Sequence, residues 1–280
     1  MPQTPRARAL GRELRSKRVA TGKSLEAIGK EVGWSRAKVS RVELAEQGIT
    51  EADVSALLVA LGVVGPEREQ LLKMTRELDQ PVWWETRHGL PAVLTELIEV
   101  EQRAQAITDV ASTLVPGLLQ TRAYSRALLD ESMPAHQIAD AVAVRQTRQD
   151  VLERSDPVQF TAYLDEAVLI RPVGSHMTTA EQLRHLLSVG RRTNVAIHVL
   201  PLELGVHRGL DGQFMLLELP NGTLSVHAEA SNAGFLLDEA DEVKPFVETV
   251  GHIGHKALNV SDSASIIEQH ADDHARKETQ

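Results

Sequence analysis

The chain has 280 residues, of which 42% are hydrophobic and 25% are charged, with 18 Gly, 12 Pro and no Cys. These figures are typical of a folded protein of one or two domains, and they exclude a disulfide scaffold, a collagen-like repeat and a low-complexity polymer. The lack of Cys excludes thiolate nucleophiles, cysteine-ligated zinc and iron–sulfur clusters. No apolar run approaches about 18 residues and the amino terminus is polar and basic, so we expect a cytoplasmic protein without a membrane span or signal peptide.

The net charge of −9 is unevenly distributed along the chain. Residues 1–50 hold eleven Lys and Arg against five Glu, a net of +6, so the other 230 residues carry a net of −15. A basic N-terminal segment in an otherwise acidic chain is expected when one small domain binds a polyanion and the rest of the chain does not. A chance imbalance of surface charge is the alternative.

The first eighty residues predict five short helices. The second helix begins after the capping residue Ser24 and ends at Gly33, and the third begins at Ser35 after a gap of about three residues. Thr50 starts the fourth helix as part of a predicted capping box, and the fifth continues to about Leu78. An all-α bundle is therefore expected over residues 1–80.

Residues 81–268 predict a second domain that mixes helices and strands. We expect helices over 91–109, 134–154, 180–189 and 239–258, with a short one after Ser261. Alternation with period two predicts strands over 158–164 and 195–199, and the turn Asn221–Gly222 predicts a hairpin of strands 214–219 and 224–228.

Residues 269–280 are polar, show no apolar face and are expected to be disordered. The expected fold is thus an N-terminal all-α helix-turn-helix bundle over 1–80, an α+β C-terminal domain over 81–268 and a tail over 269–280.

The second and third helices are the part of the chain that carries a recognisable chemistry. Two helices joined by a short glycine-containing turn inside a basic bundle indicate a helix-turn-helix unit, whose second helix enters the major groove of DNA and presents its outward side chains to base edges. Arg36 and Arg41 are suited to two-point contacts with guanine, because the planar guanidinium matches two acceptors. An exposed helix with solvated cations is the alternative.

Double-stranded DNA is therefore the expected partner. A homodimer is expected to place one such helix in each half of a palindromic site, while basic residues outside that helix hold phosphates. The predicted DNA-binding residues are cations and hydroxyls of the first three helices: Ser35, Arg36, Lys38, Ser40, Arg41, Lys23, Arg12 and Arg15.

The segment Gly22–Glu43 resembles the Cro/C1-type (XRE) helix-turn-helix of phage repressors and bacterial regulators, over roughly residues 9–63. The matching positions, where that family usually has Gly, Ser or Thr, Ile or Val, Ser and Glu, are Gly33, Ser35, Val39, Ser40 and Glu43. The resemblance implies a structural ion pair between Arg18 and Glu43. Two residues depart from the family: Leu25 replaces a polar residue, and Gly29 replaces Ala at an expected cost of up to about 1 kcal/mol.

Most of residues 83–265 resembles the large C-terminal domain of actinobacterial XRE-type regulators, a domain of poorly defined function that is often described as antitoxin-like. The motifs that carry this resemblance are Trp83–Trp84, Val115–Thr121 with Tyr124, Arg145–Gln149, Asp165–Ala167, Gln182–Leu183 and Val199–Pro201. It implies that this domain binds a small protein encoded nearby or mediates dimerisation. The alternative is a sensor that binds a metabolite and changes the spacing of two DNA-binding heads.

Two motifs favour an enzyme only weakly. Residues 35–38 have the Ser-x-x-Lys spacing of penicillin-binding enzymes, but they lie on the predicted DNA-reading helix. The carboxylates Asp165 and Glu166, near His185 or His198, are candidates for acid–base chemistry. Adjacent residues of a strand point to opposite faces, however, which favours a structural role.

Two other groups of residues are candidates for binding. His252 and His255 can share a metal ion on one helical face, but no acid at ligand spacing completes the set. Trp83 and Trp84 are candidates for a ligand or partner contact, or for a seal between domains. We expect no enzymatic activity, no metal and no cofactor.

Overall fold

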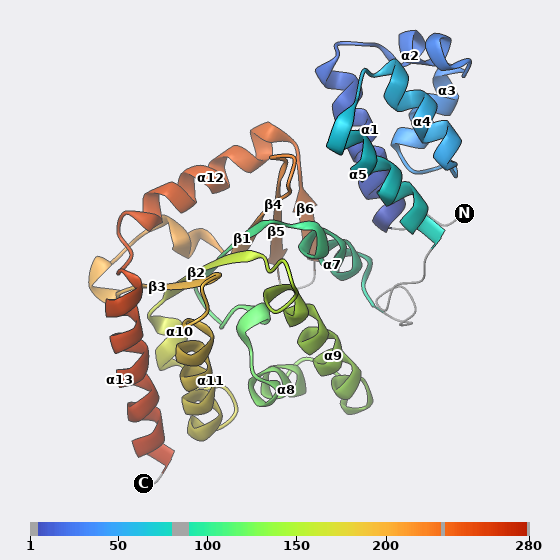
Figure 1. Cartoon of the computed structure of the whole chain (residues 1–280). Helices are drawn as coiled ribbons and strands as arrows, with labels where there is room; N and C mark the ends of the chain where they lie inside the picture. Colours follow the sequence, from blue (N-terminus) through green and yellow to red (C-terminus); the bar gives the residue numbers. More distant parts are fainter. Residues whose placement is uncertain (1–4, 80–89, 231–232, 279–280) are drawn as a thin grey trace. The chain divides into compact units, whose positions relative to one another are not determined.

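The structure of the chain is a computed structural model that describes residues 5–79, 90–230 and 233–278 (Figure 1). The chain divides into two compact units, Met1–Pro91 and Ala92–Gln280. The first is all-α and the second combines helices with a mixed sheet, as the sequence predicts.

The described part of the first unit forms a bundle of five α-helices. They are α1 (Pro5–Ala20), α2 (Leu25–Val32), α3 (Arg36–Glu43), α4 (Glu51–Ala60) and α5 (Gly65–Arg76), followed by the 3-10 turn η1 (Glu77–Asp79). The apolar faces of all five helices meet in one core, to which Leu14, Ile28, Val39, Leu58 and Leu71 contribute. The five helices predicted from the sequence are confirmed.

The turn between α2 and α3 depends on two glycines. Gly33 ends α2 with φ 72°, a left-handed conformation that side chains rarely adopt. A Cβ atom at Gly29 would lie 2.6 Å from the carbonyl oxygen of Trp34, so only glycine lets the turn fold back onto α2. The departure from Ala at position 29 thus has a structural reason that compensates for its low helix propensity.

The second unit is built on a six-stranded sheet in the order β3-β2-β1-β4-β5-β6. The strands are β1 (Ala106–Ala111), β2 (Gln159–Asp165), β3 (Val195–Leu200), β4 (Phe214–Glu218), β5 (Leu224–Ala230) and β6 (Ala233–Leu237). β1, β2 and β3 run parallel, whereas β4, β5 and β6 are joined by antiparallel pairs. The predicted hairpin is β4–β5.

Helices cover both faces of this sheet. They are α7 (Ala92–Arg103), α8 (Arg122–Asp130), α9 (Ala135–Arg148), α10 (Ala167–Ile170), α11 (His176–Val189), α12 (Ala240–Gly254) and α13 (Val260–Glu278). Figure 1 shows α12 on one face and α8 to α11 on the other. The larger core lies between the sheet face that carries Ile107 and Leu164 and the helices α7 and α11. The smaller core lies between the other sheet face, which carries Val110 and Val226, and α12.

Several elements of this unit correct the sequence analysis. The helix expected over 91–109 ends at Arg103, and the next residues form the central strand β1, because Ile107 fits the core as well from a strand as from a helix. α8 and β6 were not predicted. The helix expected over 134–154 ends at Arg148 and continues as the 3-10 turn η3 (Gln149–Leu152).

The expectation of a disordered tail is wrong for residues 269–278. α13 runs on to Glu278 and packs along α11. Ala271 and His274 are buried in that contact, where His274 Nε2 hydrogen-bonds the Leu169 carbonyl and its Nδ1 lies 2.7 Å from His176 Nδ1. A face made of one small and one ionisable residue gives a weak hydrophobic signal, which is why composition predicted disorder. None of the described helices is both long and apolar enough to cross a bilayer.

Candidate nucleic-acid interface

α3 has two distinct faces. Val39 and Val42 are buried in the bundle core. With 100° per residue, the opposite face is formed by Arg36, Ala37, Ser40 and Arg41, and of these only Ser40 is partly buried. The helix therefore offers an outward strip about two turns long.

The two arginines of this strip are the cations best placed to meet a duplex. The Arg36 side chain is 67% exposed and lies 3.6 Å from the Glu26 carboxylate, a loose contact between exposed groups. Arg41 is exposed and donates from Nε to the Gln47 side chain at 3.2 Å. The partners in both contacts are exposed or half-buried, so solvent and salt weaken the contacts. The guanidinium groups can therefore exchange these partners for phosphates or bases.

Lys38 is placed differently from the sequence expectation. Its ammonium group lies 3.7 Å from the centre of the Trp34 ring and 3.4 Å from Asp53 of α4. Burial raises the pKa of Asp53, but hydrogen bonds from Thr50 and the charge of Lys38 lower it by more. Lys38 therefore lies on the flank of α3 that faces α4, and its charge is already compensated within the bundle.

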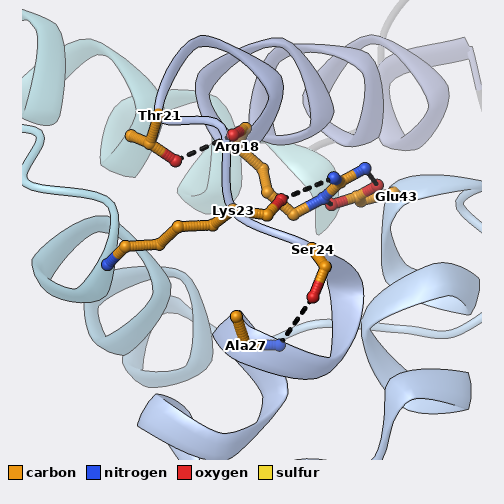
Figure 2. A network of polar contacts seen from close by, with 6 residues as sticks. All are labelled: Arg18, Thr21, Lys23, Ser24, Ala27 and Glu43. Atoms are coloured by element: carbon orange, nitrogen blue, oxygen red, sulfur yellow. Dashed lines mark hydrogen bonds and ion pairs between the residues drawn. The ribbon is translucent and has the colours of Figure 1, made fainter.

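The ion pair implied by the resemblance is present (Figure 2). The Arg18 guanidinium donates from Nε and Nη2 to the two Glu43 carboxylate oxygens at 2.6 and 2.9 Å, and from Nη1 to the Lys23 carbonyl at 3.0 Å. The hydrogen bonds to Glu43 raise the pKa of Arg18, so the guanidinium stays charged at neutral pH. α1, the α1–α2 turn and the end of α3 are thereby fixed together.

The predicted DNA-binding cations outside α3 differ in how strongly they are held by contacts within the protein. The Lys23 ammonium donates to the Ala60 carbonyl at 2.7 Å and to Glu31 at 2.8 Å, so it links α2 and α4 instead of pointing freely to solvent. On α1, Arg12 is half-buried and Arg15 exposed, and each has polar contacts within the protein. Of these three, Arg15 is the most accessible to a phosphate.

Ser35 and Ala37 refine the predicted site. The Ser35 hydroxyl accepts a hydrogen bond from the Lys38 backbone N–H at 3.1 Å and so caps the amino end of α3. Ala37 was missed by sequence reasoning, which concentrated on polar side chains. It lies exposed between Arg36 and Arg41 on the outward strip, and a methyl group at such a position can contact the thymine C5 methyl. The 100° spacing of the helix would have found it.

Trp83 and Trp84 lie outside the described residues. In the second unit, the carboxylates of Asp165 and Glu166 do not meet the predicted histidines. Asp165 accepts from the Ala167 N–H at 2.8 Å and contacts His207 at 3.0 Å. Glu166 accepts from the Leu202 N–H and contacts His270, both at 2.9 Å. Every carboxylate oxygen of the two residues thus has a partner in the fold.

The other histidines considered as candidate site residues lie apart from these two carboxylates. His198 stacks on Tyr163 and contacts the Leu258 carbonyl, while His252 and His255 lie exposed at the end of α12. In residues 5–79, 90–230 and 233–278, no three His, Asp or Glu side chains are grouped closely enough to hold a metal ion.

The bundle, its glycine turn and its basic outward helix define the first unit as a helix-turn-helix domain, the class found in DNA-binding regulators. Comparison with known families agrees, because residues 9–71 match a family described as a helix-turn-helix domain. Residues 94–269 match the family described as a domain of unknown function (DUF5753). The second match covers more than half of the chain, which therefore belongs to the DUF5753 family. No curated protein and no solved structure shows significant similarity to the chain.

Proposed function

We propose that the protein is a sequence-specific transcriptional regulator that binds duplex DNA as a homodimer, with one α3 helix in each half of a palindromic site. The observation that carries this proposal is the outward strip of α3, which presents two accessible arginines while its opposite face closes the core. A cytoplasmic location and the absence of catalysis belong to the same proposal.

Selection from a random duplex library is the direct test. The full chain is expected to enrich one inverted repeat, with half-sites centred about 10 base pairs apart or a multiple of that, and to bind it at least 1,000-fold more tightly than a scrambled duplex at physiological salt. Equal affinity for selected and scrambled duplexes would exclude sequence-specific regulation.

Dimerisation has its own test. A duplex with one intact half-site is expected to bind far more weakly than the full repeat, and sedimentation of the protein on the full repeat is expected to give two chains per duplex. One chain per duplex, with equal affinity for half and full sites, would contradict the homodimer.

For the second unit we propose a surface that binds a small protein partner, as in antitoxin-like regulators. It is supported by exposed apolar side chains on the connection between β3 and β4, where Leu202, Val206 and Leu210 are 53%, 90% and 47% exposed. Three large exposed apolar side chains within nine residues of one connection support an interaction surface there. Val206→Glu is expected to abolish co-purification with a small protein encoded next to this chain. If that protein never co-purifies with the parent chain, or if Val206→Glu changes dimerisation instead, the partner role of this surface is wrong.

A further inference from the structure

The two edges of the sheet differ in how well they are closed. At the β3 edge, the outward N–H of Val199 donates to the Ser263 hydroxyl oxygen at 2.9 Å, and the Val199 carbonyl accepts from the Leu258 N–H at 2.9 Å. α13 packs against the same strand. The chain therefore covers this edge with its own groups.

β6 forms the opposite edge and pairs only with β5 within the described residues. Hydrogen-bonded pairs alternate along antiparallel strands. The bond from the Leu219 N–H to the Thr223 carbonyl, 2.9 Å, fixes this alternation in the β4–β5 hairpin, and it turns the backbone of Ala228 towards β6. Ala228 therefore exchanges hydrogen bonds with Phe235, its partner in β6.

The residues on either side of Phe235 face the other way. By the same alternation, Gly234 and Leu236 direct their N–H and C=O groups away from β5. Within residues 5–79, 90–230 and 233–278, none of these four groups has a hydrogen-bond partner. Both residues are half-buried, so the open groups are offered to water or to another strand.

The sequence of β6 does nothing to prevent such pairing. Proteins usually guard an open edge with a charged residue, a proline or a bulge. β6 reads Ala-Gly-Phe-Leu-Leu, with neither a charge nor a proline, and its register with β5 is unbroken. Phe235, at the middle of the strand, is 44% exposed. An apolar aromatic side chain is therefore presented at an unguarded edge.

The charges next to β6 favour one orientation for a second copy of this chain. Asp238 and Glu239 follow the strand directly. Parallel pairing of two β6 strands would place these carboxylates side by side, whereas antiparallel pairing about Phe235 keeps the two copies of Asp238 about 20 Å apart. Antiparallel pairing about a two-fold axis also lets each open group meet a complementary one, because Gly234 lies opposite Leu236 of the second copy.

We propose that β6 is the surface through which the second unit forms a homodimer, with two β6 strands paired antiparallel about Phe235. The N–H and C=O groups of Gly234 and Leu236 then exchange four hydrogen bonds with the same groups of the second copy. The two Phe235 side chains lie opposite each other at the centre, and two six-stranded sheets become one continuous sheet. This inference rests on the proposed homodimer and names its surface.

Disulfide formation tests the pairing directly. The chain contains no cysteine, so an introduced thiol can form a disulfide only with its own copy. In the proposed pair the two Cα atoms of residue 235 are about 4.5 Å apart, within the range of a disulfide. The full chain with Phe235→Cys is expected to form a covalent dimer with diamide at least about tenfold faster than Leu210→Cys, a control of similar exposure (47%) on the β3–β4 connection. Equal rates, or a faster control, would overturn the pairing.

Dissociation of the dimer gives a second test. Phe235→Lys places two like charges opposite each other and is expected to raise the dimer Kd at least about tenfold in sedimentation equilibrium. Phe235→Leu and Leu210→Lys are the controls and are expected to keep the parent Kd. Leu236→Pro removes an outward N–H without removing a bond to β5, so it decides if circular dichroism shows that Phe235→Lys is unfolded.

Binding of the selected duplex separates this inference from the function on which it rests. Phe235→Lys is expected to bind a single half-site like the parent chain and the full repeat more weakly. If it keeps the parent dimer Kd, the β6 surface is wrong and the regulator stands. If the parent chain is monomeric and binds one copy per duplex, the homodimer and this inference both fail. If the parent dimerises through β6 but prefers no sequence, the regulator fails and the surface stands.

Discussion

The Arg18 guanidinium and the Glu43 carboxylate meet in a two-point ion pair that joins the last turn of α1 to the last turn of α3. Both side chains are largely shielded from water, at 14% and 8% exposure. The position of the outward strip therefore depends on an ion pair that the end of α3 makes with another helix.

Glu43→Gln is expected to destabilise the first unit by about 2 kcal/mol, because it leaves the shielded Arg18 charge without its counter-charge. Hydrogen exchange of the α3 amides measures this effect without requiring the two units to unfold together. The exposed Glu46→Gln serves as the control. Unchanged α3 protection in Glu43→Gln would show that the pair has no part in fixing the helix.

Arg36→Ala and Lys38→Ala are expected to separate the two faces of α3. Arg36→Ala should cost about 1–3 kcal/mol in binding to the selected duplex and relax the preference at one base pair. Lys38→Ala should cost less in DNA binding, because Lys38 is engaged by Asp53 and Trp34. Fluorescence anisotropy with matched and single-mismatch duplexes measures both, with Arg126→Ala of α8 as control. A larger loss for Lys38→Ala than for Arg36→Ala would mean that Lys38 leaves its partners when DNA binds.

The contribution of Asp109 to the stability of the second unit is expected to fall as pH rises from about 4 to about 7. Burial raises the pKa of Asp109 from 3.8 to about 7, so in this window the folded state keeps a proton that the unfolded state has lost. The unfolded state then binds fewer protons, and stability decreases with pH, by up to about 4 kcal/mol from this group. The comparison is urea unfolding of the parent chain and Asp109→Asn across that range. A difference between them that does not change with pH would contradict the assignment.

A chain that ends after Glu268 is expected to unfold at least about 5 °C lower than the full chain. Truncation there removes Ala271 and His274, which are buried against the rest of the unit. A chain that ends after Arg276 keeps both residues and is the control. Equal Tm values for the two truncated chains would show that the end of α13 adds nothing to the fold.

Local signals predicted the first unit well, because its helices are short, capped and separated by glycine turns. Ser24, Gly33 and Thr50 mark boundaries that depend on their immediate neighbours, and the structure has all three where the sequence indicates them. In the second unit, Ile107 is compatible with either period, and only its pairing with Phe160 and Leu217 makes it a strand residue.

The sites divide in the same way. The outward positions of α3 follow from helical spacing, apart from Lys38, whose place depends on Asp53 of another helix. The position of Asp109 and His227 on one face of the sheet was not predictable from spacing, because it is set by the order β1-β4-β5. Strand order is a property of the whole domain and leaves no mark on the residues next to Asp109.

The division of α3 into two faces has a practical consequence. None of the side chains on the outward strip takes part in closing the core, and none of the core residues Val39 and Val42 reaches that strip. Codons 36, 37, 40 and 41 can therefore be randomised as a cassette while the scaffold is kept. The resulting library should consist of equally folded proteins that differ in the operator they choose, a direct route to orthogonal switches for synthetic circuits.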